Sequence, residues 1–187
     1  PFSKCISAFN EAVFFLYINE EYDINELDLN NDAPIIVASQ KGLLCIVDYL
    51  VNHGADINAK NKTKRTPLMC AASRGFYTIS ELLVNKGCTI DLKDKKGLTA
   101  LHHAALGGNL KIVELLISKG MNKEIGNKRG VTPLHLAASG GHTSIIEYLL
   151  IKGSNINAKT REGVTPLHEA AGNNRIDAVN LLLEKGA

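Results

Sequence analysis

Three histidines recur every 33 residues and are the first candidates for chemistry in this sequence: His102, His135 and His168. Imidazole rings bind zinc and act as general bases. However, the ligands of one zinc ion lie within about 2–2.3 Å of the metal, whereas stacked helices lie about 8–10 Å apart. Adjacent rings in a stack would therefore be too distant to share an ion. We expect each ring to hydrogen-bond its own helix start to a neighbouring loop, and we predict no metal site.

Cys70, His103 and Glu169 share a second register, one position after the histidine register. A cysteine–histidine nucleophile pair needs its sulfur within about 3 Å of the imidazole, and Cys70 and His103 lie a full period apart. The sequence also contains no G-x-G-x-x-G, phosphate-loop, H-E-x-x-H or G-x-S-x-G motif. We therefore predict no catalytic residue and no cofactor, and we expect this second register to hold variable partner contacts.

The histidines belong to a phrase that the chain repeats at the same interval. It reads TPLMCAA at 66–72, TALHHAA at 99–105, TPLHLAA at 132–138 and TPLHEAA at 165–171, with a diverged copy, APIIVAS, at 33–39. Threonine followed by proline is typical of a helix start. An apolar run then follows in each unit and predicts a second helix. One pair of short helices cannot bury its own apolar face, so the pattern predicts stacked pairs.

Glycines separate the predicted elements at fixed places. Gly97, Gly130 and Gly163 mark tight turns in the connections that lead to the next threonine. Asn31 and Lys64 take the corresponding place in two earlier connections. Asparagine tolerates a positive φ better than lysine does. We expect these two turns to be distorted.

The period and the phrase resemble those of the ankyrin repeat family. The resemblance is strong over residues 33–187 and weaker over 1–32, where the apolar run 13–18 aligns with the second helix of later units. It implies an all-α, ankyrin-type solenoid of stacked helix-turn-helix repeats, with β-hairpin or loop fingers projecting beside a concave face. It also implies binding to other proteins through fingers and inner helices, without a shared catalytic residue or cofactor.

We expect residues 1–187 to form a single ankyrin repeat domain. Its predicted units are a degenerate N-terminal repeat at 1–32, repeats at 33–65, 66–98, 99–131 and 132–164, and a truncated C-terminal repeat at 165–187.

Charge is distributed unevenly along the chain. The whole chain carries 21 Lys and Arg against 19 Asp and Glu, but residues 1–32 hold one base and seven acids, which leaves 20 bases and 12 acids for the remainder. Many of those bases fall in the predicted fingers, and stacking would align them in a row. Two interpretations stay open: lysine-rich loops that aid solubility, or a docking edge for an acidic or phosphorylated partner. The near-neutral total and 5% aromatic content argue against nucleic acid.

The predicted partner-binding set combines finger bases with apolar residues beside the same groove. It comprises Lys62, Arg65, Arg74, Lys95, Lys96, Leu98, His103, Leu106, Lys128, Arg129, Val131, Arg161 and Val164. Within it, Leu98, Val131 and Val164 each precede the threonine of a helix start. Arg74 is expected to pair with a carboxylate in a bidentate manner.

We predict a non-catalytic protein–protein interaction domain that binds a protein partner through its concave face and basic fingers. A regulatory or targeting domain of a larger enzyme is the alternative, and an architectural role through self-association is a third. No run of about 18 apolar residues occurs, so we expect no membrane insertion. Four scattered cysteines without a C-x-x-C pair favour reduced thiols. We expect a monomer in the cytoplasm, with the nucleus also open.

Overall fold

The computed structural model describes residues 23–187, so the apolar run 13–18 lies outside the described residues. In this part of the chain ten helices form five consecutive pairs. They are α3 (Pro34–Lys41) with α4 (Leu44–Asn52), α5 (Pro67–Arg74) with α6 (Tyr77–Asn85), α7 (Ala100–Leu106) with α8 (Leu110–Ser118), α9 (Pro133–Gly140) with α10 (Thr143–Ile151), and α11 (Pro166–Gly172) with α12 (Ile176–Glu184). The first helices of successive pairs begin 33 residues apart, as the sequence period predicts.

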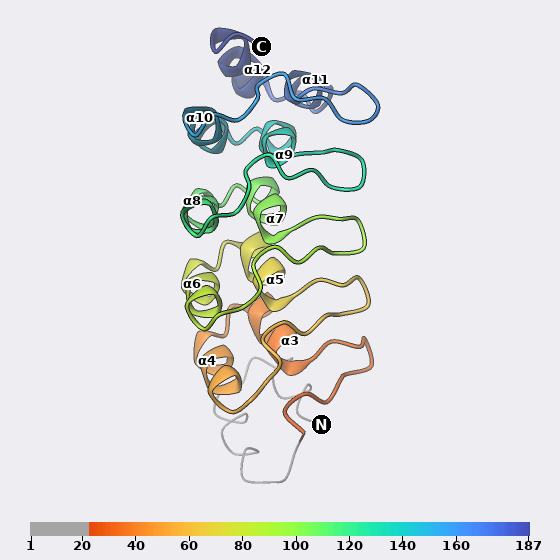
Figure 1. Ribbon diagram of the computed structural model, residues 1–187, viewed down its shortest axis with the longest axis vertical. Coiled ribbons are helices and arrows are strands. Elements are labelled where there is room, and N and C mark those ends of the chain that lie inside the picture. Colours follow the sequence, from red (N-terminus) through yellow and green to blue (C-terminus); the bar gives the residue numbers. More distant parts are fainter. Residues whose placement is uncertain (1–22) are drawn as a thin grey trace.

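The pairs stack into an elongated solenoid (Figure 1). The first helices of the pairs form an inner column and the second helices an outer column, while the connections project to one side as fingers. Helix α5 packs against α3 and α7, and α8 packs against α6 and α10. The all-α solenoid is therefore confirmed. Residues 23–187 contain no β-strand, so the fingers are loops with tight turns.

Two of the repeated histidines join each helix start to the next finger. The backbone N–H of Thr99 donates to Nδ1 of His102 at 3.2 Å, and Nε2 of the same ring donates to the carbonyl of Val131 at 3.0 Å. His135 makes the equivalent bonds to Thr132 and Val164. The predicted hydrogen-bonding role of the ladder is confirmed for these two rings.

The expected distortion of the turns at Asn31 and Lys64 is wrong. Both residues adopt a left-handed backbone, with φ of 65° and 60°, close to the 81° of Gly97. Lys64 N–H donates to the carbonyl of Asn61 at 2.8 Å, as Gly97 N–H donates to that of Asp94 at 2.9 Å. A left-handed backbone costs a non-glycine residue about 1–2 kcal/mol. The hydrogen bonds of the turn hold Lys64 in the conformation that glycine adopts elsewhere.

The core lies between the two helix columns and between successive pairs. The alanine pairs of α7 and α9 are completely buried and let the inner helices approach closely. The outer helices contribute one apolar stripe each, such as Ile112, Val113 and Leu116 of α8. Each pair thus buries its apolar face only against its neighbours, which is the physical basis of a solenoid.

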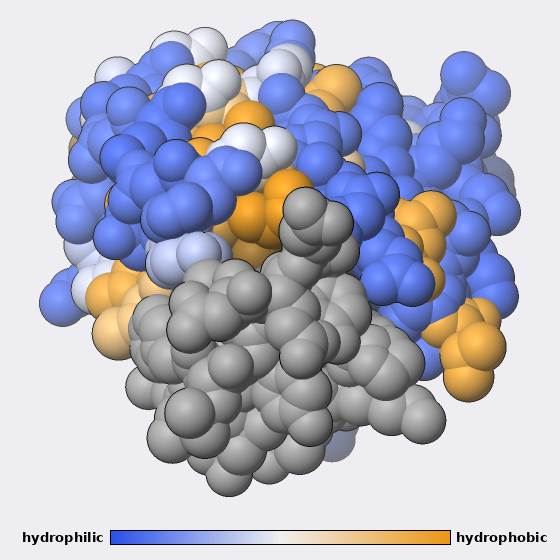
Figure 2. Space-filling view, turned by 90° about the horizontal axis from the view of Figure 1, so that it is seen from below, coloured by the Kyte–Doolittle hydropathy of each residue, from blue (hydrophilic) through white to orange (hydrophobic). Residues whose placement is uncertain are grey.

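Exposed apolar residues are scattered near the end of the stack at which the description begins. The part of residues 23–187 that is visible from that side is mostly hydrophilic, with some hydrophobic residues between (Figure 2). Leu27, Leu29 and Leu44 are among the exposed apolar side chains in this part of the sequence. Scattered exposure of this kind is normal for protein surfaces.

Helix α12 is expected to open more readily than the middle of the stack. It packs against α10 and α11, while Ile176 and Leu183 are 65% and 54% exposed. Few buried apolar contacts lower the free energy of local opening. We predict faster amide hydrogen exchange in residues 176–187 than in 112–151, measured by mass spectrometry on the 187-residue chain. Equal protection of the two segments would contradict this expectation.

Candidate partner-binding groove

Backbone hydrogen bonds join the tips of successive fingers. They run from Lys95 N–H to the carbonyl of Thr63 at 2.9 Å, from Lys128 N–H to that of Lys96 at 3.4 Å, and from Arg161 N–H to that of Arg129 at 2.9 Å. The bases at these tips are consequently held side by side. Lys95, Lys96, Lys128 and Arg161 are all exposed.

A side-chain oxygen fixes the conformation of each finger tip. Oδ1 of Asn127 accepts the N–H groups of Arg129 and Val131, at 2.8 and 3.0 Å. Oδ1 of Asp94 accepts those of Lys96 and Leu98, at 2.8 and 2.9 Å. Short polar side chains commonly stabilise turns by this local bonding. The finger bases therefore project from a preformed backbone.

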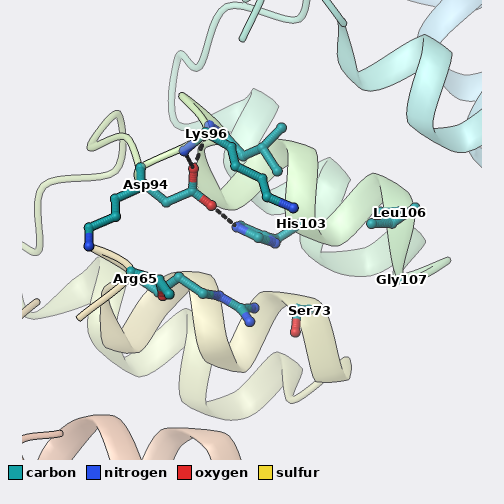
Figure 3. Close-up of a pocket in the computed structure, with 10 residues that line it drawn as sticks. Arg65, Ser73, Asp94, Lys96, His103, Leu106 and Gly107 are labelled. Carbon is teal, nitrogen blue, oxygen red and sulfur yellow. Dashed lines mark hydrogen bonds and ion pairs between the residues drawn. The ribbon is translucent and has the colours of Figure 1, made fainter. Parts of the chain in front are cut away.

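A hollow of about 600 Å³ lies between the finger that contains Asp94 and the inner helices α5 and α7 (Figure 3). Its lining consists of Thr63, Arg65, Ser73, Asp94, Lys95, Lys96, Leu98, His103, Leu106 and Gly107. We call this hollow the groove. Six residues of the predicted partner-binding set line it, namely Arg65, Lys95, Lys96, Leu98, His103 and Leu106.

Asp94 and His103 are hydrogen-bonded to each other and form one wall of the groove. Nε2 of His103 lies 3.1 Å from Oδ2 of Asp94, and both residues are buried. Burial lowers the pKa of His103, and the nearby positive charge of Arg65 lowers it further. The ring is therefore mainly neutral at pH 7, with Nε2–H donating to the carboxylate. This contact attaches the finger to α7.

Arg65 contributes a cation to the opposite side of the groove. Its guanidinium extends along α5 toward Ser73 and lies below His103 (Figure 3). The side chain is half-buried, and its Nε is buried without a hydrogen-bond partner. Leu98, Val131 and Val164 occupy the same place in later fingers. A charged residue thus stands where the three later units have an apolar one, and the preceding unit carries Asp32 in this register.

The predicted apolar contacts differ in how much surface they offer. Leu106 is 46% exposed at the end of α7, and Leu98 is half-buried at the base of its finger. Both line the groove. Val131 is only 9% exposed and offers little surface to a partner, whereas Val164 is half-buried outside the groove.

The remaining bases of the predicted set lie outside the groove, and two of them already have partners. Nζ of Lys62 donates to the carbonyl of Leu29 at 3.5 Å. Arg129 forms a 2.7 Å ion pair with Glu162 of the next finger. Arg74 is exposed at the end of α5, and Lys128 and Arg161 are exposed on later fingers.

Four groove residues were not in the predicted set: Thr63, Ser73, Asp94 and Gly107. The alignment of units contained a signal for two of them, because Ser73 shares its register with Leu106 and Gly107 shares its register with Arg74. Asp94 was visible as an acid among finger bases. Its bond to His103 was not visible, because the other units lack this combination of residues.

Cys70 and His103 do not form a nucleophile pair. Sγ of Cys70 accepts a hydrogen bond from Nε2 of Gln40 at 3.7 Å, and His103 is bonded to Asp94. Burial raises the pKa of the Cys70 thiol, which disfavours the reactive thiolate. Among residues 23–187, Cys45, Cys70 and Cys88 are free thiols, and no cluster of three or more metal-binding side chains occurs.

None of the helices in the described part of the chain combines the length and apolar character needed to cross a bilayer. A comparison with protein families supports this repeat architecture. A family model described as ankyrin repeats (3 copies) matches residues 4–94, 82–160 and 122–187, which together span most of the chain. A comparison with curated proteins gave no significant match.

Proposed function

Because the chain belongs to the ankyrin repeat family, whose repeats form protein–protein interaction domains, we propose that it binds a protein partner through the groove and the stacked basic fingers. The observation that carries this proposal is the meeting of finger bases, Leu98 and Leu106 in one hollow. Repeats of this family are typically non-catalytic, and we propose the same for this chain. The proposed unit is a single domain with repeat boundaries at residues 33, 66, 99, 132 and 165, acting as a monomer in the cytoplasm.

The chemistry of the finger row favours an acidic or phosphorylated partner segment. Lys95, Lys96, Lys128 and Arg161 are exposed and held in sequence by the inter-finger hydrogen bonds. Clustered charges of one sign accelerate association with an oppositely charged surface and fix its orientation. An extended segment lying along the fingers would contact these bases in turn while its apolar side chains reach Leu98 and Leu106.

Charge reversal of the finger row tests this proposal. We replace Lys95, Lys96, Lys128 and Arg161 together by Glu, and we leave Arg129 unchanged because Glu162 already pairs with it. The matched control replaces Lys111, Lys119, Lys152 and Lys185 by Glu, which changes the net charge equally at exposed sites on or next to the outer helices. Peptides are selected from a random library on the unmodified chain, and their affinities are measured for all three proteins across a salt series.

We expect the selected peptides to be rich in acidic residues and to bind more weakly as salt increases, because mobile ions screen exposed charges. The finger variant should lose most of the binding, and the control should lose much less. Selected peptides without acidic enrichment, or equal losses of affinity in both variants, would contradict the proposal. The basic row would then serve solubility and not partner binding.

A further inference from the structure

Arg65 forms no ion pair within the described part of the chain. In residues 23–187 Arg129 and Glu162 form an ion pair and the neutral His103 donates a hydrogen bond to Asp94, and neither contact includes Arg65. Its Nε donor is buried and has no hydrogen-bond acceptor. A buried donor left without a partner is costly, more so when it is charged. The half-buried guanidinium also carries terminal Nη donors, which an anionic oxygen supplied from outside would satisfy.

Asp94 lines the same groove but forms no ion pair with Arg65, and its carboxylate already accepts three hydrogen bonds from other groups. Asp94 accepts two backbone N–H groups at Oδ1 and the Nε2–H of His103 at Oδ2. The carboxylate is also buried. The groove therefore presents a guanidinium with unused hydrogen-bonding capacity beside an acid that is hydrogen-bonded to other groups.

The surroundings of Arg65 combine this charge with an apolar surface. Leu106 is 46% exposed and Leu98 half-buried, and both line the same hollow as Arg65. Its volume of about 600 Å³ is enough for a few side chains of a bound segment. Charge and shape together suit a segment that carries an acid beside an aliphatic residue.

We propose that the groove binds one aspartate or glutamate side chain of a protein partner through Arg65, with a neighbouring aliphatic side chain of that partner packed on Leu98 and Leu106. This inference rests on the proposed function and names the group that the groove recognises. The planar guanidinium donates two parallel hydrogen bonds to a carboxylate, which gives specificity in addition to attraction.

A carboxylate fits this groove better than a phosphate does. A phosphorylated side chain carries a charge of about −1.5 to −2 at pH 7, and the Asp94 carboxylate lines the same hollow. A doubly charged group would meet stronger repulsion from Asp94 and would be harder to place beside the two leucines. A carboxylate has a single charge and the planar shape that matches the guanidinium.

Peptide selection on two forms of the 187-residue chain tests the inference. One form is unmodified and the other carries Arg65→Leu, a residue type that the chain already has at the equivalent position, Leu98. Random displayed peptides are selected on each. We expect peptides from the unmodified chain to share one acidic position next to an aliphatic residue. Peptides from Arg65→Leu should lose that one preference and keep the general acidic enrichment due to the finger bases.

The best peptide then provides a quantitative test. Changing its shared acid to the corresponding amide should weaken binding to the unmodified chain by about tenfold or more, and should have little effect on binding to Arg65→Leu. Arg65→Lys keeps the charge but not the paired donors, so it should restore only part of the affinity. Replacing the shared acid by phosphoserine should weaken binding.

The outcomes separate this inference from the proposed function. Selection of peptides without any acidic enrichment would overturn both. Acidic peptides with the same position-specific preferences on the two forms would overturn the role of Arg65 alone. Tighter binding of the phosphoserine peptide than of the carboxylate peptide would overturn the choice of a carboxylate.

Discussion

Replacing Ala138 by Asp is expected to destabilise the domain by about 3–5 kcal/mol, because it places an unpaired charge in a completely buried position. Ala138 lies in α9, which packs against both α7 and α11. Neither neighbouring helix leaves space for a hydrated carboxylate. The measurement is the midpoint of urea unfolding, followed by circular dichroism.

The chain provides a matched control for this substitution. Ala171 occupies the same register in α11 but is exposed, so Ala171→Asp should cost only about 1 kcal/mol, mainly through lower helix propensity. Lys96→Ala, at an exposed finger base, should change stability by at most about 0.5 kcal/mol. Similar midpoints for Ala138→Asp and either control would contradict the close packing of the inner helices.

Acidification is expected to destabilise the domain through His102. The ring is completely buried, and its Nδ1 accepts the N–H of Thr99 while Nε2 donates to Val131. This pattern requires a neutral ring. Burial lowers its pKa to about 4, from about 6.5 in an exposed histidine. Protonation would turn an acceptor into a second donor facing the Thr99 N–H.

The direction of the pH effect follows from proton binding. As pH falls below about 6.5, the unfolded chain takes up a proton at His102, whereas the folded chain does so only near pH 4. The stabilisation is therefore fully present above pH 6.5 and is lost between about 6.5 and 4. A shift of this size corresponds to about 3 kcal/mol. Urea midpoints measured through this window report the loss.

His102→Met tests the assignment, because Met69 occupies the same register in α5. This variant should show a shallower decline of stability between pH 6.5 and 4 than the unmodified chain. His168→Met is the matched control, since the exposed His168 also bonds its threonine, Thr165. An unchanged pH slope in His102→Met would show that another group accounts for the acid sensitivity.

The repeat was enough to predict most of the fold. Threonine caps, alanine pairs and apolar runs recur every 33 residues, and each has one structural role that local chemistry dictates. The same register predicted that His102 and His135 bond the helix starts to loops. The prediction from residue preference failed at Lys64. Lysine disfavours a positive φ, which suggested a distorted turn, but the hydrogen bonds of the turn keep φ positive.

The groove could be predicted only in part. Finger bases and the residues before each threonine were identifiable from their register, and Arg65, Leu98 and Leu106 do line one hollow. The contact of Asp94 with His103 was not identifiable, because it depends on side-chain directions in a single unit. The near-complete burial of Val131 was not identifiable either, since the same register leaves Leu98 half-buried.

By itself the sequence determined the stacked architecture, because a strict period places chemically equivalent residues in equivalent environments. Only the tertiary structure decided which charges remain available to a partner. Arg129 is paired with Glu162 on the next finger, while Arg65 has no such acid within residues 23–187. Both are finger arginines, and their registers lie only two positions apart. Their difference arises from contacts between neighbouring units, where the reach and direction of individual side chains decide which charges meet.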